Sequence, residues 1–193
     1  MPTSFLGPYT KTILSVTLIA LTLAFAFTGM RVDVWNNLLP FFEWMETTPL
    51  GYVGKTWGAV WAAVEAVHLL ALAVLGGCII VSDGKLLGLW FTDVPARTVV
   101  DTTHKVFVRV LIILLLTGVF MASAVAMKLY YMPVYWYKML ALVGGMLYVF
   151  FIRKPLLAGD IDAINPWIVK MVAISSLLIW FTVAATGRWI GFS

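Results

Sequence analysis

Residues 57–82 read WGAVWAAVEAVHLLALAVLGGCIIVS, and this stretch decides the fold class. A helix needs about 20 predominantly apolar residues to cross the hydrocarbon core of a bilayer. The stretch is longer than that, and its interior carries only Glu65, His68 and one cysteine as titratable side chains. It therefore predicts a transmembrane helix.

Four further apolar runs have a similar length, over residues 12–30, 103–127, 134–152 and 166–189. We expect the first run to be a retained helix, because no small-residue cleavage site of a signal peptide follows it. Together with 57–82, the runs predict about five spanning helices. The chain is expected to be all-α, a polytopic transmembrane helical bundle that forms a single membrane domain over residues 1–193.

Residues 33–48 lie between the first two predicted spans and are too short and too polar to cross a bilayer. Apolar side chains recur there at helical spacing: Val34, Leu38, Phe41, Phe42 and Met45. An amphipathic helix of this kind lies in the membrane interface, with tryptophans at the level of the headgroups. The segment therefore predicts one interfacial helix, bent or started at Pro40.

The composition excludes several classes of protein. Apolar residues make up 62% of the 193 residues and charged residues 11%, so lipid must be the solvent for much of the chain. The net charge is +4, but the sequence has no basic run or nucleic-acid module, and no nucleic-acid partner is expected. The single cysteine, Cys78, excludes an internal disulfide and the cysteine motifs of c-type haem and iron–sulfur sites.

Lysines and arginines of short loops set the orientation of membrane helices. Their distribution favours slightly the side that would carry Lys11, Lys85, Arg97, Lys105, Arg153 and Lys154. We therefore expect a protein of the bacterial cytoplasmic membrane with a cytoplasmic N-terminus and the lipid bilayer as its first partner.

Glu65 and His68 are three residues apart and share one face of the predicted second helix. Ionisable residues inside a membrane helix are costly, which makes them candidates for a functional site. His68 is expected near the bilayer midplane, where it could bond a neighbouring helix, ligate a metal or haem, or bond a quinone. Glu-x-x-His is half of a di-metal carboxylate motif, but no second copy exists, which disfavours such a site.

His104 is the only other histidine. Two histidines that share one b-type haem must lie at similar membrane depth, yet the expected depths of His68 and His104 differ by about 15 Å. A shared haem is therefore disfavoured, and His104 reads as an interfacial residue. Arg109 is expected to extend toward the surface, to pair with Asp101 or Asp83, or to bind a haem propionate or lipid phosphate.

Lys138 begins the predicted fourth span at a depth similar to that of Glu65. Opposite charges at one depth predict a structural ion pair, Glu65–Lys138, that locks the second helix to the fourth.

Several short motifs resemble those of an uncharacterised group of bacterial multi-spanning membrane proteins, a domain of unknown function. Its pattern has Glu-x-x-His, then Asp-Leu-Arg-Leu-Leu-Gly at the helix end, a Thr-Gly, and an aromatic-x-x-Lys. The matching residues are Glu65, His68, Asp83, Lys85, Gly88, Thr117, Gly118, Tyr135 and Lys138. The resemblance covers roughly residues 61–151. The chain departs from the pattern at Gly84 and Lys85, which replace leucine and arginine, and the resemblance implies no known activity.

The leading hypothesis is an accessory integral-membrane subunit of a larger, redox-linked bacterial membrane complex, with other membrane protein subunits as partners. One alternative is a subunit for electron transport that binds b-type haem or a quinone itself, with His68, Glu65, His104 and Arg109 as candidate contacts. A second alternative is a small transporter or channel. An enzyme in its own right is not expected, because few polar groups converge.

Overall fold

The computed structural model describes residues 30–192, which divide into two compact units at residues 44 and 45. The first predicted span, 12–30, lies outside the described residues except for Met30. Helix α2, Met30–Thr47, confirms a helix over the predicted 33–48 segment, with Pro40 inside it. In the first unit, the Phe41 ring packs against Phe42 and Trp44, with ring centroids 5.9 and 5.8 Å apart. Its interfacial location stays a prediction.

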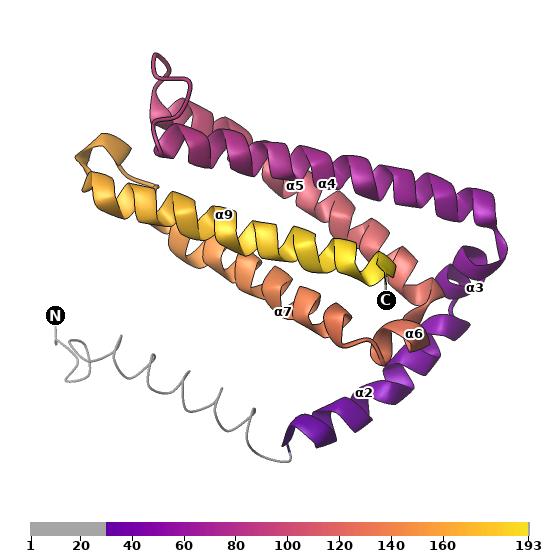
Figure 1. Ribbon diagram of the computed structural model, residues 1–193. Coiled ribbons are helices and arrows are strands. Elements are labelled where there is room, and N and C mark those ends of the chain that lie inside the picture. Colours follow the sequence, from indigo (N-terminus) through magenta and orange to yellow (C-terminus); the bar gives the residue numbers. More distant parts are fainter. Residues whose placement is uncertain (1–29, 193) are drawn as a thin grey trace, which may run out of the picture. The chain divides into compact units, whose positions relative to one another are not determined.

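The second unit is an all-α bundle (Figure 1). Among the described residues, four helical segments are long and apolar enough to cross a membrane: Gly58–Leu86, Ala96–Ala124, Pro133–Leu156 and Pro166–Phe192. The chain is therefore a helical membrane protein. At most a third of the most apolar window of each span is buried, so the apolar surface of each helix is only partly covered by the other helices.

The predicted boundaries hold best where proline marks a helix start. Helix α9, Pro166–Trp189, coincides with the predicted fifth span, with Pro166 in its first turn and the Asn165 side chain as its N-cap. Helix α4, Gly58–Leu86, continues past the predicted end at residue 82. Helix α5, Ala96–Ala124, begins before the predicted 103 and stops before 127, because α6, Ala126–Tyr130, is a separate helix.

The helical segment of the fourth predicted span continues beyond residue 152. Helix α7, Pro133–Leu147, continues without a break into a π-helix, η2, Tyr148–Arg153, and then into α8, Lys154–Leu156. Arg153 was read as a charge at the helix stop, but it lies inside the helical segment and is buried.

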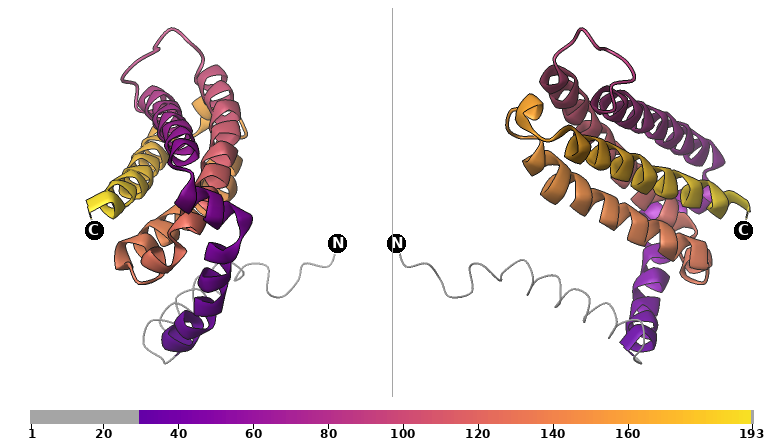
Figure 2. Two further views of the ribbon diagram at one scale, coloured as in Figure 1. Left: turned by 90° about the vertical axis from the view of Figure 1, so that its right-hand side faces the viewer. Right: turned by 60° about the vertical axis from the view of Figure 1, so that its left-hand side comes forward.

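The core joins all four spans. Helices α4 and α5 lie side by side, as do α7 and α9, and α4 also packs on α9 (Figures 1 and 2). The buried residues of the main cluster are Leu75, Ile79, Phe107, Leu111, Val149, Trp180 and Val183. Their spacing along each helix follows the three- and four-residue rule for one helix face.

Short helix α3, Pro49–Thr56, packs against the end of α5 through two glycines. A Cβ at Gly51 would lie 2.9 Å from the carbonyl oxygen of Ser123, and one at Gly54 would lie 2.6 Å from the Ala124 Cβ. Real Cβ atoms do not approach so closely, so the helices meet because both positions are glycine.

The loop after α4 folds back on the helix end. Gly88 has φ +79°, which ends the helix in the left-handed region. The Trp90 ring lies against Gly84, in space that any side chain at residue 84 would occupy. Lys85 Nζ donates to the Phe91 carbonyl at 2.8 Å.

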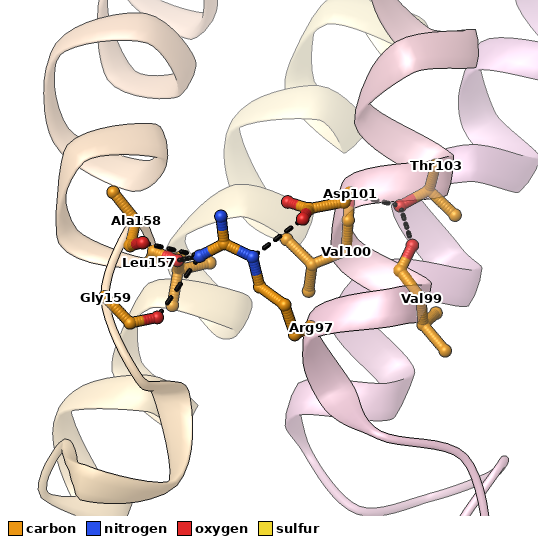
Figure 3. A network of polar contacts seen from close by, with 8 residues as sticks. All are labelled: Arg97, Val99, Val100, Asp101, Thr103, Leu157, Ala158 and Gly159. Carbon is orange, nitrogen blue, oxygen red and sulfur yellow. Dashed lines mark hydrogen bonds and ion pairs between the residues drawn. The ribbon is translucent and has the colours of Figure 1, made fainter.

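Arg97, at the start of α5, forms hydrogen bonds with the residues that follow α8 (Figure 3). Its Nη1 donates to the carbonyl oxygens of Leu157, Ala158 and Gly159 at 3.0, 2.6 and 3.2 Å. Its Nε donates to Asp101 at 2.7 Å. The guanidinium thus satisfies the carbonyl of Leu157, the C-cap residue of α8, which has no intrahelical partner, and two carbonyls of the loop after it.

Candidate functional site

His68 and Thr117 join α4 to α5 through a hydrogen bond. His68 Nδ1 lies 2.7 Å from Thr117 Oγ1, and both side chains are half-buried. A Cβ at Gly118 would lie 3.6 Å from His68 Cε1, so the ring packs on the helix backbone beside the threonine. The histidine was predicted from the sequence, but its partner was not.

Thr117 Oγ1 also lies 2.7 Å from the carbonyl oxygen of Ile113 and 3.2 Å from that of Leu114. A hydroxyl has only one proton to donate. When Thr117 donates that proton to a backbone carbonyl, it accepts from the Nδ1–H of His68, and the neutral imidazole then carries a lone pair on Nε2.

Nε2 of His68 is open. Among residues 32–192 it has no hydrogen-bond partner, and it is not one of the enclosed unpaired atoms of that part of the chain. A histidine whose Nδ1–H is held by an oxygen and whose Nε2 is free is oriented as histidine ligands of metals and haem usually are.

Lys138 and Glu65 both act electrostatically on His68. The Lys138 side chain crosses α9 at Gly187, where a Cβ would lie 3.4 Å from Cε and from Nζ. The absence of a side chain at Gly187 leaves this path open. Glu65 is exposed on α4. We call His68, Thr117, Glu65 and Lys138 the His68 cluster.

The predicted ion pair Glu65–Lys138 does not form in the described structure. The ion pairs within 4 Å between residues 32 and 192 are Lys55–Glu46, Arg97–Asp101 and Arg153–Asp83. The prediction rested on depth and charge alone. Lys138 lies instead along α9, while Glu65 points outward from α4, so similar depth does not bring the two charges together.

His104 and Arg109 lie apart from His68. His68 is level with Thr117, which is 13 residues along α5 from His104, or on the order of 20 Å. One haem cannot take both histidines of this arrangement as axial ligands. Arg109 is exposed, and its predicted partners are engaged elsewhere: Asp101 binds Arg97, and Asp83 binds Arg153.

A buried ion pair, missed by the sequence reasoning, joins α4 to η2. Arg153 Nη2 donates to Asp83 Oδ1 at 2.7 Å and to Ser82 Oγ at 2.6 Å. Asp83 is fully buried and Arg153 is 7% exposed. Ser176 of α9 approaches the Asp83 carboxylate without hydrogen-bond geometry. With His104 and Trp180 nearby, these residues form what we call the Asp83 cluster.

Arg153 lies on the buried face of the helical segment. Val149 and Arg153 are the buried residues of η2, four positions apart, and the helix continues through both of them. A charge of opposite sign at the end of each of two spans was the available signal for the pair, but a charged residue beside lysine and proline is typical of a helix end.

The described residues contain no group of three or more His, Cys, Asp or Glu side chains that could hold a metal ion. The His68 cluster therefore offers one histidine nitrogen as a ligand, not a complete metal centre. A site built on it would need further ligands from a cofactor or from another chain.

Residues 41–193 match the model of a family described as a family of unknown function, DUF6644. No curated protein and no solved structure matches the chain. The match covers most of the chain, including both clusters. The chain therefore belongs to the DUF6644 family, as the resemblance to an uncharacterised family of membrane proteins predicted.

Proposed function

We propose that this protein is an accessory membrane subunit of a larger bacterial complex, in which His68 Nε2 contacts a b-type haem or a quinone. The observation that carries the proposal is the contact of His68 Nδ1 with Thr117 Oγ1 at 2.7 Å, which leaves Nε2 as the open ring nitrogen of a histidine in an apolar helix.

Exposed charged side chains on the spans support the proposal that the protein is one subunit of a complex. Glu65 and Arg109 are exposed on apolar helices, and neither forms an ion pair within 4 Å among residues 32–192. Lipid does not solvate a carboxylate or guanidinium, so such residues usually face protein or a water-filled cavity. A partner subunit that covers α4 near Glu65 would satisfy this requirement.

The chemistry of the His68 cluster suits two ligands. A haem iron takes an imidazole nitrogen as an axial ligand, and the second axial ligand would come from another subunit, since His104 is too distant. A quinol hydroxyl would instead donate to Nε2, while the Lys138 ammonium would donate to the oxygen of the opposite hydroxyl. Both ligands use the same lone pair, so the experiment must separate them.

The first test is gentle purification of the protein from its native membrane. Visible spectra of the oxidised and reduced sample detect haem, organic extraction detects quinone, and mass spectrometry identifies co-purifying chains. We expect stoichiometric partner subunits together with about one haem or quinone per chain. A colourless, quinone-free preparation without stoichiometric partners would overturn the proposal.

Three variants assign the ligand to its residue. His68→Ala removes the nitrogen and should abolish binding, and Thr117→Val removes the hydroxyl that contacts Nδ1 and should weaken it. His104→Ala changes the other histidine and should leave ligand stoichiometry unchanged. Equal ligand content in the His68→Ala and wild-type proteins would contradict the assignment.

A further inference from the structure

The Asp83 cluster encloses polar atoms that the protein itself does not satisfy. Within residues 32–192, the buried side-chain atoms without a hydrogen-bond partner are Asp83 Oδ2, His104 Nε2, Arg153 Nε and Trp180 Nε1. His104, Arg153 and Trp180 line one cavity of about 10 Å³, and Asp83 is ion-paired to Arg153. Three of the four unpaired atoms thus belong to side chains that line the cavity, and the fourth belongs to the ion-pair partner of one of them.

These four atoms have complementary roles. Arg153 Nε–H and Trp180 Nε1–H can only donate, because arginine stays protonated and an indole nitrogen has no acceptor lone pair. The Asp83 carboxylate oxygen accepts. His104 Nε2 accepts when the imidazole proton is on Nδ1. The cluster therefore presents two donors and two acceptors.

We propose that this cluster binds a single ordered water molecule that joins α4, α5, η2 and α9. A water molecule has two protons and two lone pairs, which match the two acceptors and two donors. A cavity holds one water when its volume is about 10–15 Å³ and when two to four polar partners surround it. The cavity of about 10 Å³ meets both conditions.

Other small ligands fit less well. An anion would meet the Asp83 carboxylate, and a cation would meet the Arg153 guanidinium, at a pair whose charges already balance. Both ions are also harder to desolvate than water in so small a space. A neutral water molecule, which can make four hydrogen bonds, matches the two donors and two acceptors better than either ion.

The water would complete the buried ion pair. A buried pair stabilises a protein only when further hydrogen bonds satisfy its remaining donors and lone pairs. Arg153 Nε and Asp83 Oδ2 are the atoms that the direct contacts at 2.6 and 2.7 Å leave over. One water bonded to both of these atoms would connect the ion pair through hydrogen bonds to His104 and Trp180.

A map of the purified protein at a resolution that shows ordered water tests the site directly. We expect one spherical peak at about 2.7–3.2 Å from each of the four atoms. Closure of the cavity, with the four atoms bonded to one another, would overturn the proposal. Exchange of chloride for bromide identifies an anion, and a stronger peak after that exchange would also overturn it.

Hydroxyl-radical footprinting by X-rays gives a second readout in solution, because radicals formed from a bound water modify the side chains it contacts. Trp180 is 6% exposed and Tyr130 is 2% exposed, so both are buried aromatic residues. We expect Trp180 to be modified many times faster than Tyr130, the matched control. Equal, slow modification of the two residues would contradict a bound water at Trp180.

Discussion

Asp83→Asn is the substitution that most directly tests the energetics of this bundle. The change keeps the shape of the side chain but removes the charge that faces Arg153 at 2.7 Å. Asp83 is fully buried and Arg153 is 7% exposed, so no solvent can replace the lost carboxylate. Breaking a buried pair by removing one partner typically costs about 3–5 kcal/mol. We expect a loss of free energy of unfolding of about that size.

The chain supplies its own control in Arg97–Asp101. This pair also joins an arginine to an aspartate at 2.7 Å, but its side chains are 49% and 48% exposed. Exposed pairs contribute only about 0–1 kcal/mol. Asp101→Asn therefore changes the same chemistry at the same distance, and burial is the variable that separates the two substitutions.

The assay is reversible unfolding in detergent micelles, followed by the helical signal as denaturant is added. A double replacement, Asp83→Leu with Arg153→Met, should recover most of the loss, because apolar residues often replace a buried pair without penalty. The reasoning would be refuted if Asp83→Asn and Asp101→Asn lowered the free energy of unfolding equally.

Three further substitutions test other contacts of the second unit. Partial burial raises the pKa of Glu46, but hydrogen bonds from Lys55 and a backbone amide outweigh this and lower the pKa below its ordinary 4.5. Stability from this group is thus fully present above pH 4.5 and is lost as the pH falls further, and Glu46→Gln should flatten that dependence of the thermal midpoint on pH. Gly84→Leu should displace the Trp90 ring, and faster proteolysis of the loop after α4 than in wild type would show it. Gly51→Ala should lower the thermal midpoint through its clash with backbone carbonyls, whereas Gly77→Ala, with open space around it, should not.

The sequence predicts the spans of this protein because a bilayer requires long apolar runs. Such runs can be recognised without knowing how the helices pack against one another. It predicts the start of α5 poorly. Residues 96–102 include Arg97, Asp101 and Thr102 and fail the test for a spanning segment, yet they are helical. Arg97 holds that turn by binding the carbonyls after α8, a contact between residues 60 or more positions apart.

The sequence likewise reveals some residues of the two clusters and not others. His68 stands out in the sequence because a histidine in an apolar helix is rare. Thr117 appears in the sequence only within the Thr-Gly motif of the family pattern, and nothing there pairs it with His68, because threonines in such helices usually bond their own backbone, as this one also does. Arg153 was counted with the loop charges because an arginine beside lysine and proline is typical of a helix end, yet the helix continues past it and buries it.

The two clusters differ in how their polar groups are compensated within a membrane protein. Arg153 and Asp83 are buried together and neutralise one another. His68 is held by one bond on Nδ1 and keeps Nε2 open, about 22 Å from Asp83 along α4. A buried pair whose charges balance within the chain contributes to stability, whereas an open histidine nitrogen in an apolar helix is available to a ligand from outside the chain. That difference is why the search for a ligand belongs at His68 and the test of stability belongs at Asp83.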